Sequence, residues 1–257
     1  MRLILIIFLL IFGFPVFSKT ITGEVQKDGL GNFNRVYDAY TNYPIPNAKV
    51  KIPSKNYITH TDKEGAFVLG TTINAPTIMS VEKAGYKPFS MTLNTNEKAP
   101  IIVGIEKSTP NDIVVETSII HLGDNSFSEN SANASEFTLG ADGAFYSKNF
   151  EFKTLNNFQS VILSIGSIIG IDTIEAQKMG QSRVKTSYSS PPEIFCNGSK
   201  IAEIKINADN QKIDIPSALL IGKNILNITI KTGRNLTKRS DIDYDDIEFT
   251  NLLLEIK

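Results

Sequence analysis

Apolar residues in this chain alternate with polar ones over short stretches, and this period constrains the fold more than any other feature. In the runs 48–52, 161–165 and 226–230, every second residue is Ala, Val, Leu or Ile. Such alternation is typical of half-buried strands, and Gly, Asn, Asp and Pro separate the runs, as turns do. Beyond residue 18 no stretch of about ten residues has the apolar spacing of an amphipathic helix. We therefore expect an all-β fold of two tandem β-sandwiches.

The alternation changes phase near the end of the chain. Ile247 and Phe249 share one parity, whereas Leu252, Leu254 and Ile256 share the other. Side chains of a strand point to opposite faces in turn, so a change of parity would turn the second set away from the core. One extra residue in the strand would let both sets of side chains point to the same core. We therefore expect a β-bulge between the two sets.

The first eighteen residues differ from the rest of the chain. Met1-Arg2 gives a short positive start, residues 3–17 are almost wholly apolar, and Val16 and Ser18 occupy positions −3 and −1 of a cleavage site. This pattern predicts a signal peptide over 1–18 with cleavage after Ser18. The product would be secreted or periplasmic, with no transmembrane segment after cleavage; an uncleaved N-terminal anchor is the alternative.

Composition excludes several classes of function. With 26 Lys and Arg against 27 Asp and Glu, the net charge of −1 argues against nucleic-acid binding through phosphate neutralisation. One cysteine excludes a disulfide framework and a thiolate zinc cluster, and we expect Cys196 to be a buried, small apolar residue. The length suits two domains, and the polar stretch 106–112 has the character of a linker. We therefore divide the chain into 19–105 and 113–257.

Four segments of the first domain carry a recognisable pattern: 21–25, 44–50, 59–69 and 81–88. Asp62 to Gly65 is a hairpin-turn signal, because Asp bonds its own backbone and Gly accepts a positive φ. The alternating Phe67 and Leu69 after it predict a strand with both side chains in the core, and Thr20 to Val25 predicts the first strand of the domain. Gly85 supplies another turn, which Tyr86 anchors. In this order the segments resemble the carboxypeptidase regulatory-like domain, a transthyretin-like sandwich with a carbohydrate-binding-like fold. The resemblance implies a non-catalytic module, and carbohydrate binding is the function commonly attributed to its fold.

The second domain carries the segments 121–124, 150–152, 194–198, 222–228 and 243–249. Asn197-Gly198 lies between apolar runs and predicts a tight hairpin. Gly222 to Asn224 leads into the alternating run that follows. Together these segments resemble a galactose-binding-like jelly roll. That resemblance implies a sugar-binding or interaction module.

Aromatic side chains are the first candidates for ligand contact, because sugar rings stack on aromatic faces. The chain has no Trp, so tyrosine has to serve. A long polar connection over 27–43 carries three tyrosines, and two more lie in the second domain. The candidates are Tyr37, Tyr40, Tyr43, Tyr146 and Tyr188. For the first three, capping one end of the sandwich is the alternative role.

Acidic residues gather near the C-terminus. They are Asp241, Asp243, Asp245, Asp246 and Glu248. Carboxylates this close repel one another unless they are solvated, paired or bound to a hard cation, so we consider calcium as a cofactor. An EF-hand is excluded, because Asp246 replaces its turn glycine and Leu252 its closing glutamate. The alternative is a solvated acidic loop paired with Arg234, Lys238 and Arg239.

Motifs for catalysis are missing from the sequence. There is no His-Glu-x-x-His, no Gly-x-Ser-x-Gly and no phosphate-binding glycine loop. His121 and Asp124 could form a pair, but a single His at the end of an apolar strand is more often structural. We expect an exported, non-catalytic protein that binds carbohydrate or cell-surface material and needs no cofactor except calcium. A structural adaptor for other proteins is the alternative, and a carboxylate-dependent hydrolase using Asp245 and Asp246 is a third.

Overall fold

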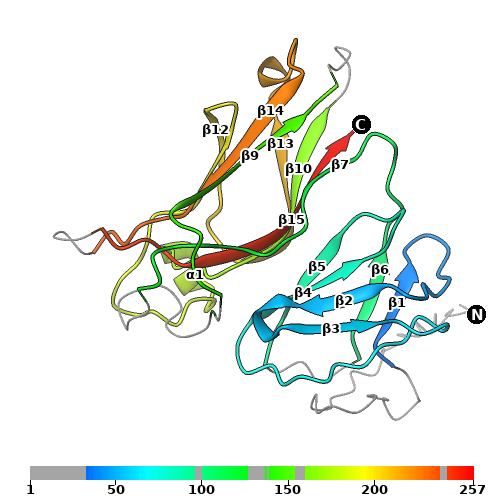
Figure 1. Ribbon diagram of the computed structural model, residues 1–257. Helices are drawn as coiled ribbons and strands as arrows, with labels where there is room; N and C mark the ends of the chain where they lie inside the picture. The colour runs from blue at the N-terminus through cyan, green and yellow to red at the C-terminus, as the bar shows by residue number, and fades with distance from the viewer. Residues whose placement is uncertain (1–32, 96–99, 127–136, 138, 154–159, 238–241) are drawn as a thin grey trace, which may run out of the picture.

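The computed structural model describes residues 33–95, 100–126, 137, 139–153, 160–237 and 242–257. The predicted signal peptide, 1–18, and the first predicted strand, near Thr20 to Val25, lie outside these residues. Strands form nearly all of the regular structure, and the α-helix α1 spans only Ile174–Lys178. The all-β class predicted from the alternating pattern is therefore confirmed (Figure 1).

The N-terminal lobe, residues 33–105, contains two sheets with a core of its own. One sheet has the strand order β3-β2-β4-β5 and is antiparallel, and the other is the parallel pair β1-β6. Alternate residues such as Val50, Val81 and Val103 are buried in the core between them. The strands are β1 (Arg35–Asp38), β2 (Lys49–Ile52), β3 (Tyr57–His60), β4 (Thr77–Glu82), β5 (Phe89–Leu93) and β6 (Ile102–Ile105), and a short 3-10 helix, η1, spans Pro53–Lys55.

The predicted turn at Asp62 forms as expected. Its carboxylate Oδ1 accepts hydrogen bonds from the backbone N–H groups of Glu64 (2.9 Å) and Ala66 (2.8 Å), and Gly65 has φ +71°. The expected strand at Phe67 and Leu69 is not regular, although both side chains are buried. The structure therefore keeps the predicted burial but reduces the strand to an isolated bridge at Ala66.

The C-terminal lobe, residues 113–257, contains two larger sheets that pack face to face. The first has the order β13-β10-β15-β7, with β8 also paired to β15, and the second has the order β12-β11-β14-β9. Both contribute to one core, for example Leu163 and Phe249 from the first, and Ile194 and Ile228 from the second. The elements are β7 (Ile113–Glu116), β8 (Ile120–Leu122), β9 (Phe145–Glu151), β10 (Val161–Ile169), β11 (Glu193–Cys196), β12 (Ser199–Glu203), β13 (Ala208–Ile215), the 3-10 helix η2 (Ser217–Leu219), β14 (Ile225–Lys231) and β15 (Ile247–Ile256).

Hairpins of this lobe follow the sequence signals closely. Asn197 and Gly198 have φ values of +49° and +80° and join β11 to β12, as the Asn-Gly pair predicts. Gly222 has φ +71° and precedes β14. Cys196 is fully buried, as expected, and burial raises the pKa of its thiol to about 11. The thiol is therefore held in its neutral, unreactive form.

The predicted change of phase in β15 is confirmed. Asn251 has φ +59°, and the register with β7 shifts between Leu252 and Leu253. Ile247, Phe249, Leu252 and Leu254 consequently all reach the same core. The neighbouring strand β10 also changes phase, because Val161, Leu163 and Ile165 share the core with Ile168. Gly166 lies at that change, where a Cβ would stand 2.7 Å from Cβ of Asn251.

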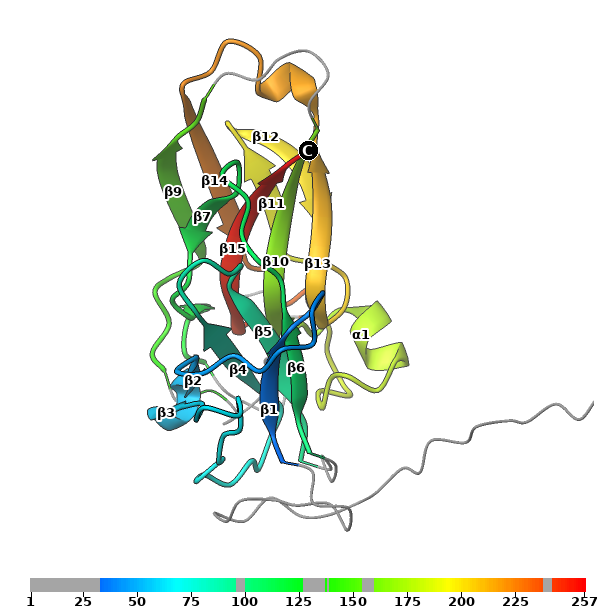
Figure 2. The same ribbon diagram turned by 90° about the vertical axis from the view of Figure 1, so that its right-hand side faces the viewer.

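The lobes meet where β5 of the N-terminal lobe lies beside β10 and β13 of the C-terminal lobe (Figure 2). Both apolar and polar contacts join them, since Ile78 of β4 packs with Phe137 and Ile169 in one buried cluster. Lys87 Nζ lies 2.9 Å from Glu255 Oε2, and the Thr92 N–H donates to Asp209. Residues 106–112, the predicted linker, contain no strand. They are nevertheless held to the N-terminal lobe, because the Lys87 N–H donates to the Glu106 carbonyl. Among the residues described, no helix is long and apolar enough to cross a membrane.

Candidate functional site

The outer face of the sheet β12-β11-β14-β9 carries a ladder of small polar side chains. Thr229 lies opposite Ser147 on β9, and Asn227 lies opposite Asn149. The Asn227 amide donates to Ser147 Oγ (2.9 Å) and to Asn149 Oδ1 (2.8 Å), and Thr229 Oγ1 donates to Asn227 Oδ1 (2.8 Å). The opposite face of these strands packs into the core, so the alternation leaves a hydrogen-bonded polar surface open to solvent.

A groove of about 780 Å³ lies over one end of this ladder. Phe145, at the start of β9, is its largest exposed apolar side chain, with 62% of its surface exposed. Leu236 and Tyr244 add apolar surface from the connection between β14 and β15. The remaining side chains are polar or small: Ala144, Ser147, Ser190, Pro191, Glu193, Glu203, Thr229, Lys231, Thr232 and Arg234. The groove thus combines aromatic surface with groups that donate or accept hydrogen bonds.

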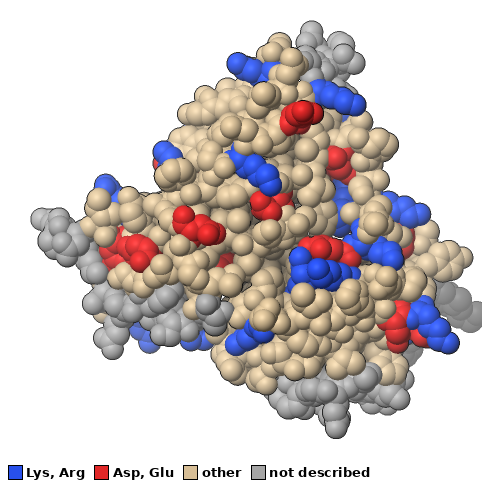
Figure 3. Space-filling view, viewed as in Figure 1, with Lys and Arg blue, Asp and Glu red and all other residues tan. Residues whose placement is uncertain are grey.

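Charges along the groove are balanced. Lys231 on β14 lies opposite Glu193 on β11, and its Nζ stands 4.5 Å from the centre of the Phe195 ring. Lys200 contacts Glu193 (3.0 Å) and Glu203 (2.8 Å) from the edge strand. Both signs are likewise mixed over the face of the molecule seen in Figure 3. The groove therefore has no strong preference for an anion or a cation.

Two loops that pack closely form the end of the groove. The Ser190 N–H donates to the Arg234 carbonyl (2.9 Å), and Ser190 Oγ accepts from the Arg234 N–H (3.1 Å). A Cβ on Gly233 would stand 1.8 Å from the Ser190 carbonyl oxygen, so only glycine permits this approach. The position of the loops is therefore set by backbone contacts rather than by flexible side chains.

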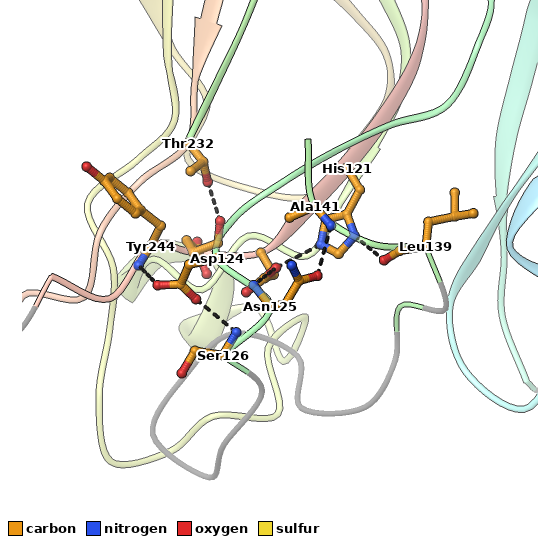
Figure 4. Close-up of polar contacts among 10 residues, drawn as sticks. His121, Asp124, Asn125, Ser126, Leu139, Ala141, Thr232 and Tyr244 are labelled. Carbon is orange, nitrogen blue, oxygen red and sulfur yellow. Dashed lines mark hydrogen bonds and ion pairs between the residues drawn. The ribbon is translucent and has the colours of Figure 1, made fainter. Parts of the chain in front are cut away.

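Beneath this end lie four buried carboxylates, which we call the acidic cluster: Asp172, Asp245, Asp246 and Glu248, each exposed by 1% or less. The cluster is tied to the groove, because Thr232 Oγ1 donates to the Asp245 carbonyl. A neighbouring contact joins Tyr244 of the groove to Asp124, whose Oδ2 accepts from the Tyr244 N–H (2.9 Å) (Figure 4). The cluster thus supports the groove from inside.

The prediction of a solvated acidic loop is wrong for the residues described here. Asp243 is also buried, with 3% exposed, and only Asp241, Lys238 and Arg239 lie outside the described residues. The reason is that the segment enters β15, which occupies the centre of its sheet. A Cβ on Gly123 would stand 2.1 Å from Asp246 Oδ1, which shows how tightly the neighbouring loop covers the carboxylate.

His121 balances part of this charge. Its Nε2 lies 2.8 Å from Asp246 Oδ1 and its Nδ1 lies 2.6 Å from the Leu139 carbonyl, so both ring nitrogens face acceptors (Figure 4). Although burial opposes the charged ring, the hydrogen bonds to Asp246 and Leu139 raise the pKa of His121 above its ordinary value. Its partner is thus Asp246 rather than Asp124, and its role is to hold β8 against β15.

Two other members of the cluster favour their neutral forms. Burial raises the pKa of Asp245 well above its ordinary range, and the nearby Asp172 carboxylate adds to the effect. Burial also raises the pKa of Glu248, to about 7, although the charge on His121 works in the opposite direction. Asp245 Oδ1, Asp246 Oδ2 and Glu248 Oε1 find no hydrogen-bond partner among the described residues. The cluster is therefore costly to keep ionised.

The residues do not assemble a metal site by themselves. No three His, Cys, Asp or Glu side chains within the described part of the chain converge so as to hold a metal ion. Asp241, one of the predicted calcium ligands, is not among the described residues. Calcium binding consequently stays a prediction that rests on the sequence pattern.

The five predicted tyrosines do not form one platform. Tyr40 and Tyr43 are exposed by 74% and 73%, on a turn closed by Asp38, whose Oδ1 accepts from the Tyr40 N–H (3.0 Å). Tyr37 belongs to β1 and packs against Gly104, where a Cβ would stand 3.0 Å from the tyrosine ring. All three lie in the N-terminal lobe, far along the chain from the groove.

Neither tyrosine of the C-terminal lobe is among the residues that line the groove. The Tyr146 ring packs edge-on against Phe249 in the core, with ring centres 5.8 Å apart, and its hydroxyl donates to Glu116 Oε2 (3.2 Å). Tyr146 is therefore half-buried against the core. Tyr188 is half-buried, and its carbonyl accepts from the Leu236 N–H (2.9 Å).

Sequence reasoning missed the groove, although one signal was present. Phe145, Phe195 and Ile225 occupy the outward phase of strands whose other outward residues are polar. No protein-family model matches the chain, and no curated protein matches it. The function therefore has to be argued from the residues themselves.

Proposed function

We propose that this protein is a non-catalytic binding protein that holds carbohydrate in the groove on the sheet β12-β11-β14-β9. The observation that carries the proposal is Phe145, exposed by 62% at the edge of a groove of about 780 Å³. An aromatic face stacks on the apolar face of a sugar ring, and the adjacent Ser147 and Thr229 hydroxyls can bond sugar hydroxyls. Phenylalanine here takes the place of the absent tryptophan.

The ligand we propose is neutral. Glu193 and Glu203 offset Lys231 and Arg234 among the lining residues, so a polyanionic chain gains no net attraction. Carboxylate and guanidinium groups both bond hydroxyls in geometries that suit neighbouring sugar oxygens. A neutral cell-wall or storage polysaccharide therefore fits better than an acidic one.

Titration calorimetry with neutral oligosaccharides tests this proposal. Phe145→Ala should weaken binding by about 1 kcal/mol or more, because the stacking face is lost. Ile225→Ala is the matched control: Ile225 is also 62% exposed and lies on β14 outside the groove. Equal binding by both variants, or no binding by the folded wild-type protein at millimolar ligand, would refute a sugar site in this groove.

The absence of catalysis is part of the proposal. Asp245 and Asp246 are exposed by 1% and 0%, and a general acid or nucleophile has to reach its substrate. The third candidate function, a hydrolase, would have to use them. The non-catalytic assignment would be overturned if the wild type hydrolysed a glycan and a folded Asp245→Asn variant did not.

We also propose the finer identities of the two lobes and the route of export. The Asp62 turn and the motifs around it support a carboxypeptidase regulatory-like N-terminal domain, 19–105. The two facing sheets and the Asn197 hairpin support a galactose-binding-like jelly roll, 113–257. The apolar start of the sequence supports export to the periplasm or the outside of the cell.

A structural adaptor is the second candidate function. Tyr40 and Tyr43 stand exposed on a turn that Asp38 closes, a rigid arrangement suited to contact with a protein partner. A pull-down from the envelope fraction distinguishes the adaptor from the sugar-binding protein. It compares the wild type with a Tyr40→Ser, Tyr43→Ser double variant. A stoichiometric protein that the double variant loses would favour the adaptor, whereas equal capture would remove these tyrosines from the contact.

Calcium is a separate proposal. It is supported by the burial of Asp243, Asp245, Asp246 and Glu248 next to one another in the chain. Since the described side chains alone do not form a metal site, backbone carbonyls or Asp241 would have to complete it.

A further inference from the structure

Arg234 lines the groove on the sheet β12-β11-β14-β9, and its side chain has no partner among the described residues. The sequence suggested that it pairs with the acidic run that follows, but Asp243, Asp245 and Asp246 are buried whereas Arg234 is exposed. Within the described part of the chain, its guanidinium forms neither an ion pair nor a hydrogen bond. Its N–H donors are therefore available to solvent or to a ligand.

The other charged side chains that line the groove already have contacts. Glu193 and Glu203 both contact Lys200, at 3.0 and 2.8 Å. Lys200 belongs to the edge strand β12, so the two glutamates are held towards that side of the sheet. Lys231 Nζ stands 4.5 Å from the centre of a phenylalanine ring on β11. Among the lining residues that the structure describes, Arg234 is consequently the charged group that is left for a ligand.

The backbone beside Arg234 is fixed from two sides. On one side Arg234 exchanges two hydrogen bonds with Ser190, of 2.9 and 3.1 Å, and on the other it forms an antiparallel bridge with Tyr244. Just before it, the Gly233 carbonyl accepts from the Asp245 N–H (2.9 Å). The planar guanidinium is itself a rigid fork of donors. Less conformational freedom is therefore lost on binding than for a long side chain on a mobile loop.

Arg234 also lies close enough to Phe145 to contact the same ligand. Phe145 is directly opposite Lys231, and the pairing continues one step further, because the Thr232 N–H donates to the Ala144 carbonyl (3.0 Å). Arg234 follows Lys231 by three residues, so these two Cα atoms are at most about 11 Å apart. A sugar stacked on the Phe145 ring is thus within the range of an extended arginine side chain.

We propose that Arg234 is the specificity-determining residue of the groove, and that it selects sugars with two adjacent free hydroxyl groups. The guanidinium fork presents two parallel N–H donors, which match two neighbouring oxygen acceptors at once. A sugar that lacks one oxygen of the pair would meet a single donor. This inference rests on the proposed sugar-binding function, and it names the part of the sugar that the groove recognises.

Ligand-observed NMR titration of the full chain tests the inference. The probes are the methyl glycosides of glucose, mannose and galactose, and the 3-deoxy analogue of each, whose ring has no adjacent pair of hydroxyls. The wild type should bind at least one glycoside saturably and its 3-deoxy analogue about tenfold more weakly, the loss expected for one hydrogen bond to a charged group. Arg234→Lys keeps the charge but loses the fork, so it should bind both sugars weakly and about equally.

Arg183→Lys is the matched control, because Arg183 is an exposed arginine of the same lobe that does not line the groove. It should discriminate between the two sugars as the wild type does. Binding that Phe145→Ala weakens but Arg234→Lys leaves unchanged would overturn the role of Arg234 and leave the sugar groove standing. No binding of any probe by the folded wild type would overturn both.

An acidic sugar provides the remaining comparison, since arginine also pairs with carboxylates. The wild type should bind methyl glucuronide no more tightly than methyl glucoside, and added salt should leave binding of the neutral sugar nearly unchanged. Tighter, salt-sensitive binding of the glucuronide that is lost in Arg234→Gln would assign Arg234 to a carboxylate, and would overturn selection of the hydroxyl pair.

Discussion

Replacement of Glu248 by Gln should remove the part of the loss of stability at rising pH that is caused by ionisation of this one buried carboxyl group. Glu248 lies on β15 opposite His121 of β8, is 1% exposed, and has an Oε1 without a hydrogen-bond partner among the described residues. Burial raises its pKa from 4.5 to about 7, with His121 acting in the opposite direction. In the unfolded chain the carboxyl group ionises near its ordinary pKa.

The sign follows from proton binding. Between pH 4.5 and 7 the folded protein keeps a proton on Glu248 that the unfolded chain has lost, so the free energy of unfolding falls as pH rises. Each pKa unit corresponds to about 1.4 kcal/mol, and the whole rise therefore corresponds to about 3 kcal/mol. His121 contributes in the same direction, because its pKa is also raised in the folded state.

Denaturant unfolding from acid to weakly alkaline pH measures this effect. Near pH 4.5 the Glu248→Gln variant and the wild type should differ little, whereas at about pH 8 the variant should be more stable by up to about 3 kcal/mol, or roughly 6 to 12 °C in Tm. Glu151→Gln, at the exposed end of β9, is the control and should follow the wild type. Parallel profiles for the wild type and Glu248→Gln would show that Glu248 does not titrate in this range, and would refute the reasoning.

Four further predictions follow from individual contacts. Although burial opposes ionisation, hydrogen bonds from Ser164, Lys87 and Lys212 lower the pKa of Glu255 to about 2, so stability should fall as pH drops from 4.5 to 2, and Glu255→Gln should flatten this acid limb in the same unfolding assay. Gly233→Ala should destabilise the C-terminal lobe by about 2 kcal/mol and weaken groove binding, because its Cβ would meet the Ser190 carbonyl; an unchanged Tm would contradict the close approach. If calcium binds the native state, Tm should rise with millimolar calcium and fall with chelator, and identical melts would count against it. N-terminal sequencing of exported protein should begin at Lys19, and an intact Met1 would support the uncleaved anchor instead.

Local signals foretold the parts of the fold that depend on neighbouring residues. The Asp62 turn and the Asn197-Gly198 hairpin form as expected, because each needs only its own backbone geometry and one or two hydrogen bonds. The β-bulge in β15 could also be predicted from the sequence. Phe249 and Leu252 have opposite parity, and both can face one core only if an extra residue lies between them. Where the alternating pattern was weaker, as at Phe67, the side chain is buried as predicted but the backbone forms no regular strand.

The candidate site was less predictable, because its residues come from distant segments. Phe145 on β9 lies opposite Lys231 on β14, and neither segment contains a pattern that predicts its pairing with the other. The pair of His121 and Asp246 is separated by 125 positions, and nearby Asp124 was the more obvious partner from sequence alone. The packing of the half-buried Tyr146 ring against Phe249 likewise joins residues that lie far apart in the chain.

By itself the sequence determined the class of fold, the turns and the parity of each strand, because these depend on steric preferences and on which face of a strand is apolar. Only the tertiary structure decided which polar residues are buried and with whom. The acidic run of Asp243 to Glu248 looks like a solvated loop until β15 takes the centre of a sheet, and Asn251 looks like a turn residue until the N-terminal lobe closes over it. Burial and partnership are properties of the assembled chain, because they depend on residues far apart in sequence.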